Sequence, residues 1–203
     1  MDVAPAAAAE PLAEHLAMSM ARVVRAAMDG DVAAFEMLIA AHIERTHRVA
    51  QAVLGSALDA RDATQEAWLA AWRQLPRLRD PERFDAWLHR LVVNACYAEA
   101  RSERRWVAKV RVISNDTTPL EPDVARSVAA KDELEGAFRR LTPEQRAVVV
   151  LHHHLGYPLT EIAETLGIPE GTARSRLHYA VRQLRAVLDH DGRSLATSGE
   201  RPA

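Results

Sequence analysis

The chain has 203 residues, of which 48% are apolar and 27% charged, and its formal net charge is −2. This is the composition of an ordinary soluble globular protein, and it excludes a disordered chain, a fibre and a uniformly basic nucleic-acid coat. The longest apolar stretch without a charged side chain, Ala147–Thr160, is shorter than the roughly 20 residues that a membrane span needs. We therefore expect no membrane insertion.

The N-terminus and the single cysteine bear on compartment and cofactors. Asp2 stands where a secretory signal would carry Lys or Arg, and no long apolar run follows it. Cys96 is the only cysteine, so the chain can form neither an internal disulfide nor a thiolate metal site. His152, His153 and His154 are consecutive and would point in three directions on a helix. We expect a cytoplasmic protein with no metal and no cofactor.

The spacing of apolar residues predicts an all-α fold of two small helical domains. Apolar positions recur three and four apart through most of the chain, and no alternating β-branched run is present. Residues 114–124, SNDTTPLEPDV, bury too little apolar surface to order themselves, which predicts a flexible linker. The predicted order is a mobile extension over 1–20, a helical domain over 21–105, a linker over 106–130, a helical domain over 131–188 and a mobile tail over 189–203.

Capping residues mark the predicted helices of both domains. In the first domain Asp31 can cap the second helix, and Asp80 with Pro81 can begin the fourth. In the second domain Thr142 before Pro143 is an N-cap, and we expect Thr160 to cap the short helix that follows. The expected ranges are 21–29, 31–54, 60–75, 82–103, 131–140, 143–154, 160–166 and 171–187.

The third predicted helix carries a polar face with two tryptophans four residues apart, Trp68 and Trp72. Such a face can be a protein-docking surface. The residues alone slightly favour the alternative, in which both tryptophans are core and the charges are solvated. The polar and apolar positions on neighbouring turns are Asp62, Gln65, Glu66, Leu69 and Arg73.

The fourth predicted helix carries a second stripe beside its core stripe. The second stripe interleaves aromatic rings, arginines and one amide, a combination that can stack unpaired bases, neutralise phosphate and read a base edge. In the alternative, Trp87 is core and Tyr97 packs half-buried, and this helix by itself favours the alternative. The members of the stripe are Trp87, Arg90, Asn94, Tyr97 and Arg101.

Basic residues gather in two separate parts of the chain. Arg73–Arg111 holds ten bases and five acids, and Thr172–Ala186 holds four bases and no acid. Between them, Asp116–Glu135 has a charge of −4. This pattern indicates two places that meet phosphate. We also expect the two domains to approach one another in the free chain, with acids competing with phosphate for the arginines.

The segment Thr160–Arg185 has the pattern of a helix-turn-helix. Gly167 can end a short helix in a left-handed conformation, Ile168 and Pro169 make the turn, and a longer helix follows. A face of this kind on the second helix suits the major groove. The alternative is a solvated amphipathic helix, which the absence of acids disfavours. The exposed face is expected to hold Arg174, Ser175, His178, Tyr179 and Arg182, opposite Ala173, Leu177, Ala180, Val181, Leu184 and Leu188.

Three stretches in this order resemble the bacterial RNA polymerase sigma factors of the extracytoplasmic-function (ECF) group. They are DVAAFEMLIAAH followed by DARDATQEAWLAAWRQL, then RFDAWLHRLVVNACYAEARSERR, and finally LTPEQRAVVVLHHHLGYPLTEIAETLGIPEGTARSRLHYAVRQLR. Together they cover most of the chain. The ordered set is far more specific than any one stretch.

The resemblance implies three binding surfaces. The first surface would bind the coiled coil of the largest polymerase subunit. This makes protein docking, and not a core role for both tryptophans, the preferred interpretation of the third predicted helix. In the second, Asn94 matches a position that can hold a flipped base. The first surface comprises Asp62, Gln65, Glu66, Leu69, Trp72 and Arg73; the −10 surface comprises Trp87, Arg90, Asn94, Tyr97, Arg101, Arg104 and Arg105; and the −35 surface comprises Thr172, Arg174, Ser175, Arg176, His178, Tyr179 and Arg182.

The sequence departs from the family at two of these places, so a promoter sequence cannot be borrowed from a relative. Ala98 stands where Asp is common, and Tyr179 stands where Arg is common. The interpretation is a sigma factor, not an enzyme, that binds core RNA polymerase and promoter DNA and has an anti-sigma factor as an expected partner. The alternative is a free-standing helix-turn-helix regulator with a helical sensing or dimerisation domain.

Overall fold

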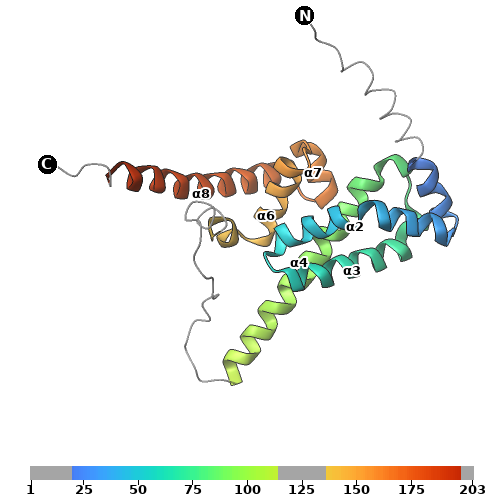
Figure 1. Ribbon diagram of the computed structural model, residues 1–203, viewed down its shortest axis with the longest axis horizontal. Coiled ribbons are helices and arrows are strands. Elements are labelled where there is room, and N and C mark those ends of the chain that lie inside the picture. The colour runs from blue at the N-terminus through green and yellow to red at the C-terminus, as the bar shows by residue number, and fades with distance from the viewer. Residues whose placement is uncertain (1–19, 114–135, 198–203) are drawn as a thin grey trace, which may run out of the picture.

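The computed structural model describes residues 20–113 and 136–197, with side chains over 20–103 and 136–186. Within these ranges the chain forms helices and no strand, which confirms the predicted all-α fold (Figure 1). The part of the chain described here contains no helix with the length and apolar character of a membrane span.

The N-terminal domain is built on three long helices that lie against one another, α2, α3 and α4. Two short 3₁₀ turns connect the last two of them. The elements are a helix over residues 20–28, α2 (Val32–Leu54), α3 (Ala57–Gln74), η1 (Leu75–Arg77), η2 (Pro81–Arg83) and α4 (Phe84–Ile113).

Side-chain caps fix where these helices begin. The carboxylate of Asp31 accepts a hydrogen bond from the amide of Ala34 at 3.1 Å, as predicted, and satisfies one free amide of the first turn of α2. The Asp80 carboxylate likewise accepts from the amide of Glu82. Ser56 caps α3, which therefore begins three residues earlier than predicted. Gly55 ends α2 at a φ of 76°, a left-handed conformation that glycine adopts without strain.

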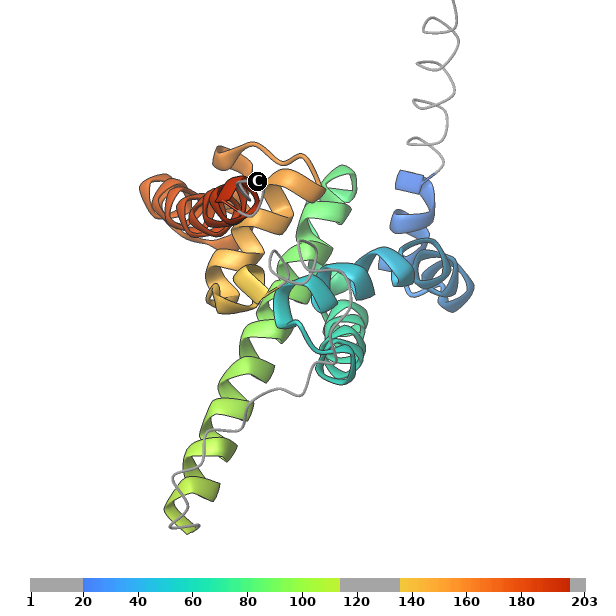
Figure 2. The same ribbon diagram turned by 60° about the vertical axis from the view of Figure 1, so that its left-hand side comes forward.

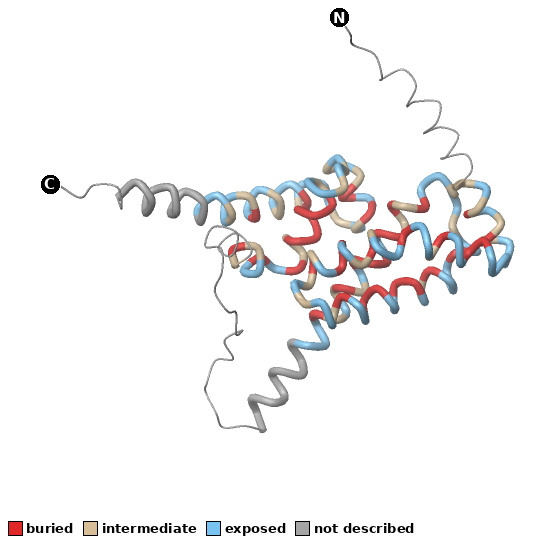
Figure 3. Tube along the Cα trace, viewed as in Figure 1, coloured by how far each residue is buried: buried red, intermediate tan, exposed pale blue. Residues whose placement is uncertain are grey.

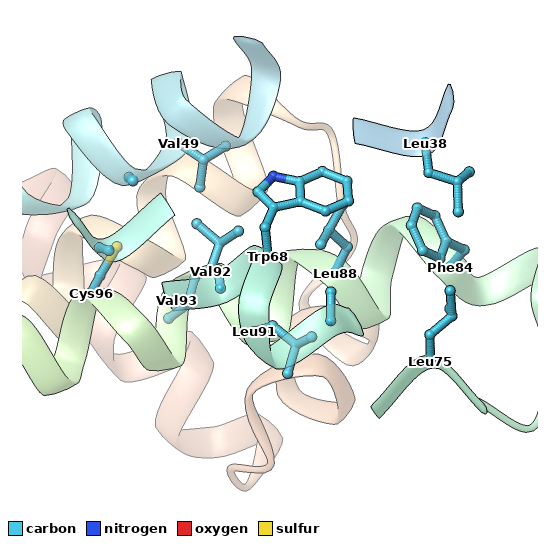
Figure 4. Close-up of a cluster of buried hydrophobic side chains, with 14 of the residues drawn as sticks. Leu38, Val49, Trp68, Leu75, Phe84, Leu88, Leu91, Val92, Val93 and Cys96 are labelled. Carbon is cyan, nitrogen blue, oxygen red and sulfur yellow. The ribbon is translucent and has the colours of Figure 1, made fainter. Parts of the chain in front are cut away.

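The core of this domain surrounds Trp68 on α3. Its indole is only 6% exposed, and Nε1 donates a hydrogen bond to Oγ1 of Thr46 on α2 at 3.2 Å. The paired N–H is what allows the large ring to be buried at low cost. Figure 4 shows aliphatic side chains from α2 and α4 around it, and they include Val49, Leu88, Leu91, Val92 and Val93.

The C-terminal domain packs its helical segments around a small core. Thr142 caps α6 and Pro143 takes the first helical position, as predicted. In addition, Thr142 and Gln145 form a reciprocal capping box. The expected cap at Thr160 is wrong. Helix α7 begins at Leu159 after Pro158, so Thr160 lies inside the first turn and caps nothing. The elements are a helix over residues 136–140, α6 (Pro143–Val149), a π-helical turn η3 (Val150–His154), α7 (Leu159–Leu166) and α8 (Glu170–Thr197).

Two helices run about ten residues past their predicted ends, α4 to Ile113 and α8 to Thr197. Residues 104–113 contain no glycine or proline, so nothing in the sequence interrupts α4 there. Gly192 is the only such residue in the added part of α8, and one glycine costs about 1 kcal/mol. In Figure 2 the end of α4 projects well clear of the other helices.

The two domains are in contact. Helices α6 and α7 pack against α4, and α6 also packs against α2 (Figures 1 and 2). Ala147 and Val150 of the C-terminal domain belong to the same buried cluster as the core of the N-terminal domain. In Figure 3 buried positions continue from the inner faces of α2 and α4 into α6. The expectation that the domains approach one another agrees with this arrangement, and the acidic segment between them, residues 116–135, lies outside the described residues.

Candidate functional site

The predicted polymerase-binding residues form one exposed surface on α3, which we call the α3 face. Trp72 and Leu69 are 42% and 40% exposed, although both are large and apolar. The alternative in which both tryptophans are core therefore holds for Trp68 only. All six residues are exposed: Asp62, Gln65, Glu66, Leu69, Trp72 and Arg73.

An apolar hollow of about 500 Å³ lies beside the α3 face, between α2 and α3. Its walls are Trp68, Leu69 and Trp72 from α3 and Ile39 and Ile43 from α2. The edge of the Trp72 ring meets the ring of Phe35, with centroids 4.8 Å apart, which fixes the indole in place. The contribution of α2 was not predicted. Its signal is a partly exposed isoleucine pair four residues apart, Ile39 and Ile43, on an otherwise polar face.

The predicted −10 stripe on α4 divides into a polar half and an aromatic half. Arg90, Asn94 and Arg101 are exposed. Arg90 and Asn94 line a hollow of about 460 Å³ between α3 and α4, whose opposite wall includes Glu66 and Gln74. The helix continues through Arg104 and Arg105, whose side chains lie outside the described part. The amide of Asn94 is thus open to a base at the edge of a hollow.

The aromatic half of the stripe is half-buried. The rings of Trp87 and Phe84 have centroids 5.8 Å apart, and Trp87 packs against the domain core. Burial raises the pKa of the Tyr97 phenol, and its Oη has no hydrogen-bond partner among the residues that the structure describes. The alternative of packing roles for Trp87 and Tyr97 thus agrees with their burial in this conformation.

The helix-turn-helix is present as α7, a turn and α8, with Gly167 at a φ of 65°. Ala173 and Ala180 are buried, and Leu177, Val181 and Leu184 are half-buried, as the predicted inner stripe requires. Thr172 and Arg176 are half-buried at the edge of the face. The residues predicted for the outer face are all exposed: Arg174, Ser175, His178, Tyr179 and Arg182.

Contacts within α8 orient this face. Arg174 forms an ion pair with Glu170 one turn earlier, and the guanidinium of Arg182 lies over the Tyr179 ring, 5.1 Å from its centroid. The hydroxyl of Ser175 donates to the carbonyl of Thr172 at 3.1 Å. Glu170 was not predicted to take part. Its signal is the spacing of four residues between Glu and Arg in the first turn, where the helix dipole favours an acid.

None of the described residues form a group of three His, Cys, Asp or Glu side chains that could hold a metal ion. The predicted surfaces present exposed arginines, one amide and aromatic rings.

Two family matches cover the two domains. The Sigma-70 region 2 family matches residues 38–106, and the family described as Sigma-70, region 4 matches residues 137–186. The ECF RNA polymerase sigma factor SigM of Mycobacterium tuberculosis is 34% identical over 177 residues, which are 85% of this chain and 86% of SigM. SigL, an ECF RNA polymerase sigma factor of the same species, is 35% identical over 85% of this chain and 98% of its own length.

The chain belongs to the ECF RNA polymerase sigma factors.

Two solved structures share the fold. The sigma factor RpoE of Bartonella quintana, in complex with the anti-sigma factor NepR, superposes with a TM-score of 0.61 at 21% identity, over 76% of this chain and 96% of RpoE. CnrH, in complex with the cytosolic domain of CnrY, gives a TM-score of 0.59 at 26% identity, over 85% of this chain and 98% of CnrH. This ECF sigma factor therefore recognises promoters, and the free-standing regulator is not favoured. Region 2 spans the α3 face and the stripe on α4, and region 4 spans the helix-turn-helix.

Proposed function

We propose that the α3 face docks this sigma factor on core RNA polymerase, that α4 reads and melts the −10 element, and that α8 reads the −35 element. The sigma factor lends specificity and strand separation to the polymerase, performs no catalysis itself, and acts in the cytoplasm. The observation that carries this proposal is the exposure of the α3 face and of Asn94 in a chain that also has a helix-turn-helix. A regulator that binds only duplex DNA has no use for the first two.

At the −10 element each half of the stripe has its own task. Asn94, at the edge of the hollow between α3 and α4, holds a base that has left the stack. Trp87 and Tyr97 provide rings for stacking on unpaired bases. The basic side chains that neutralise the phosphates of the opened strand are Arg90, Arg101, Arg104 and Arg105.

At the −35 element the face of α8 divides its contacts along the helix. Arg174 and Ser175, near the start of α8, reach base edges, as the first residues of a recognition helix do. Arg182, two turns further on, meets phosphate. Thr172, Arg176, His178 and Tyr179 complete the surface that enters the major groove.

An anti-sigma factor is the further partner that we propose. The fold shared with RpoE, which was solved in complex with the anti-sigma factor NepR, supports this assignment. A pull-down of the proteins encoded beside this chain, with core polymerase as competitor, tests it. The expected partner is displaced by the polymerase.

Reversing the charges of Asp62 and Glu66 together, as Asp62→Lys with Glu66→Lys, is expected to weaken binding to core polymerase by at least about 2 kcal/mol, roughly thirtyfold. The cost arises because both carboxylates meet basic partners in an interface that excludes water. The fold is expected to survive, since both side chains are exposed. Titration of labelled core enzyme measures the affinity.

The matched control reverses two exposed acids away from the α3 face, Asp29→Lys with Glu36→Lys. This control changes the net charge equally and should leave the affinity for core enzyme within about threefold of the wild type, because exposed and unpaired charges contribute little. Equal weakening by both double variants would show a nonspecific effect of net charge, and unchanged binding by the first would refute docking through the α3 face.

Arg174→Ala and Arg182→Ala are expected to fail in different ways. Losing a base contact at Arg174 relaxes preference at one −35 position by about 1 to 3 kcal/mol. Losing a phosphate contact at Arg182 weakens all sequences alike and lowers the salt slope of binding by about one. Run-off transcription by holoenzyme on a promoter library with a randomised −35 element measures the first, and binding at several salt concentrations measures the second. A larger change of sequence preference in Arg182→Ala would reverse the assignment.

A further inference from the structure

His42 ties helix α2 to the first turn of α4. Its Nε2 lies 3.0 Å from Oδ1 of Asp85, the second residue of α4, and its Nδ1 lies 2.9 Å from the carbonyl oxygen of Leu38, one turn earlier on α2. The residue is only 9% exposed. The hydroxyl of Thr46 donates to the carbonyl of His42 at 3.0 Å and accepts from the indole of Trp68, so the α2 end of this link belongs to the buried core.

Both ring nitrogens of His42 face hydrogen-bond acceptors. A carbonyl oxygen can only accept, so Nδ1 donates to Leu38. Asp85 accepts as a carboxylate, because Nη1 of Arg45 lies 3.7 Å from its other oxygen and the pKa of the carboxyl is lowered, first by the hydrogen bond from His42. A neutral imidazole carries one N–H and could make only one of the two bonds. The ring is therefore a charged imidazolium, and its bond to Asp85 raises the pKa of His42 above the ordinary 6.5.

The charged and titratable groups of the described residues around this ring are Asp85, Arg45 and His89. Asp85 favours the charged form of His42, whereas Arg45 disfavours it. His89, one turn after Asp85 on α4, is neutral at neutral pH because burial lowers its pKa to about 4. Its Nδ1 lies 2.9 Å from the hydroxyl of Tyr157, whose pKa burial raises to about 12. His42 is thus the member of this cluster whose charge changes as the pH rises above 6.5.

The ring of His42 also contacts the aromatic side chains at the start of α4. It meets the ring of Phe84, the first residue of the helix, nearly at a right angle, with centroids 5.4 Å apart. Phe84 is 3% exposed, and in Figure 4 it lies next to Leu38. One turn further on, the ring of Trp87 has its centroid 5.8 Å from that of Phe84. Ring contacts therefore run from the imidazolium through Phe84 to Trp87, the first aromatic residue of the −10 stripe.

The first turn of α4 depends on such a tie because the segment before it is short and irregular. The 3₁₀ turns η1 and η2 precede the helix, and a 3₁₀ turn has poorer hydrogen-bond geometry than an α-helix. Helix ends fray where contacts do not hold them. Asp85 favours the positive end of the helix dipole and binds the imidazolium of α2, so it holds this end in two ways. When the ring loses its proton, one of its two hydrogen bonds and the charge opposite Asp85 are lost.

We propose that His42 is a positioning residue of the −10 surface. Its charged ring, through Asp85 and Phe84, holds the first turn of α4 so that Trp87 is oriented for stacking on the opened strand, and promoter opening weakens as the pH rises and the ring loses its proton. This inference rests on the proposed role of α4 at the −10 element, but the link between His42 and Trp87 is measured without polymerase or DNA.

Histidine-selective NMR of the full chain tests the charged ring, with the His42 signal assigned by its loss in His42→Gln. This signal should titrate above pH 6.5 in the wild type. Asp85→Asn keeps the shape of the side chain but not its charge, and should lower the pKa of His42. A pKa of His42 at or below 6.5 in the wild type overturns the charged ring.

Fluorine NMR of the chain labelled with fluorotryptophan tests whether Trp87 follows the ring. The signal that Trp87→Phe removes should shift with the same midpoint as His42, and should stay constant between about pH 6 and about pH 8.5 in His42→Gln. His153→Gln, at an exposed histidine of η3, should behave as the wild type does. If His42→Gln disturbs folding, Asp85→Asn keeps the test decisive, because both midpoints should move together to lower pH. A Trp87 signal that does not follow the titration of His42 overturns the positioning role.

Permanganate footprinting of holoenzyme on a promoter selected by run-off transcription gives the functional readout. The ratio of open complexes formed by the wild type to those formed by His42→Gln should fall at least about fivefold between about pH 6.5 and about pH 8.5, a modest coupling between an effector and a second site. Both should bind core polymerase equally. A constant ratio overturns the effect on opening. Full opening by Trp87→Ala would instead refute the proposed −10 role of Trp87, and the NMR results on His42 would stand.

Discussion

Trp68→Ala is expected to lower the free energy of unfolding by about 3 to 5 kcal/mol, whereas Trp72→Ala is expected to change it by no more than about 1.5 kcal/mol. The two residues are one helical turn apart, but Trp68 is buried with its N–H paired to Thr46, whereas Trp72 is 42% exposed and meets the ring of Phe35. Urea unfolding followed by circular dichroism measures both.

For binding to core polymerase, substitution of Trp72 should have the larger effect and substitution of Trp68 the smaller. Trp72→Ala removes an exposed aromatic anchor and should weaken binding by at least tenfold, as truncation of central aromatic residues does in many interfaces. Trp68→Phe, which keeps most of the buried volume, should bind nearly as the wild type does. Equal losses of stability for the two alanine variants would show that Trp72 is a core residue and not part of the docking face.

Acid is expected to destabilise the chain through His89, by about 3 kcal/mol between pH 7.5 and pH 4. The pKa of His89 is lowered from 6.5 to about 4, mainly by burial, with Arg45 and His42 contributing to the shift and Asp85 opposing it. The unfolded chain takes up this proton below pH 6.5 and the folded chain does so only near pH 4. The stabilisation is therefore complete above pH 6.5 and is lost as the pH falls through this window.

The variant His89→Gln isolates this effect, because it keeps a polar group opposite Tyr157 but cannot titrate. Between pH 7.5 and pH 4 its free energy of unfolding should fall by about 3 kcal/mol less than that of the wild type. His42 works in the opposite direction: its hydrogen bond to Asp85 raises its pKa, so its stabilisation is complete below pH 6.5 and is lost as the pH rises through its folded pKa. Parallel pH profiles of wild type and His89→Gln would show that His89 is not buried in its neutral form.

Sequence reasoning succeeded where a few neighbouring residues decide the structure. Asp31 and Thr142 cap helices because the bond joins residues three apart, and Gly167 ends α7 because its conformation is local. The exposed face of α8 followed from a period of 3.6 residues and from the absence of acids over Thr172–Ala186, although Glu170 in the first turn pairs with Arg174. In each case the information lies within one or two helical turns.

Contacts between distant parts of the chain could not be predicted in the same way. The periodicity of α4 places Trp87 and Tyr97 on a second stripe, but it does not say that α7 covers them. Helix α6 packs apolar side chains into the cores of both domains, Ala147 into one and Val148 into the other. In the sequence these residues form a single short hydrophobic run, which does not reveal two partners. The expected cap at Thr160 is wrong because Pro158, two residues earlier, is the extended N-cap residue and the helix begins at Leu159. The residues of three predicted surfaces therefore came from the sequence, while their accessibility required the tertiary structure.

The burial of Cys96 determines how the folded chain can respond to oxidants. Its side chain has no exposed surface, and burial raises the pKa of the thiol to about 12, so the thiol stays protonated at neutral pH. The thiolate is the form that peroxides and disulfides attack. Since Cys96 is the only cysteine, the folded chain presents no exposed thiol to oxidants. Oxidation of this thiol therefore requires that the core around it opens first.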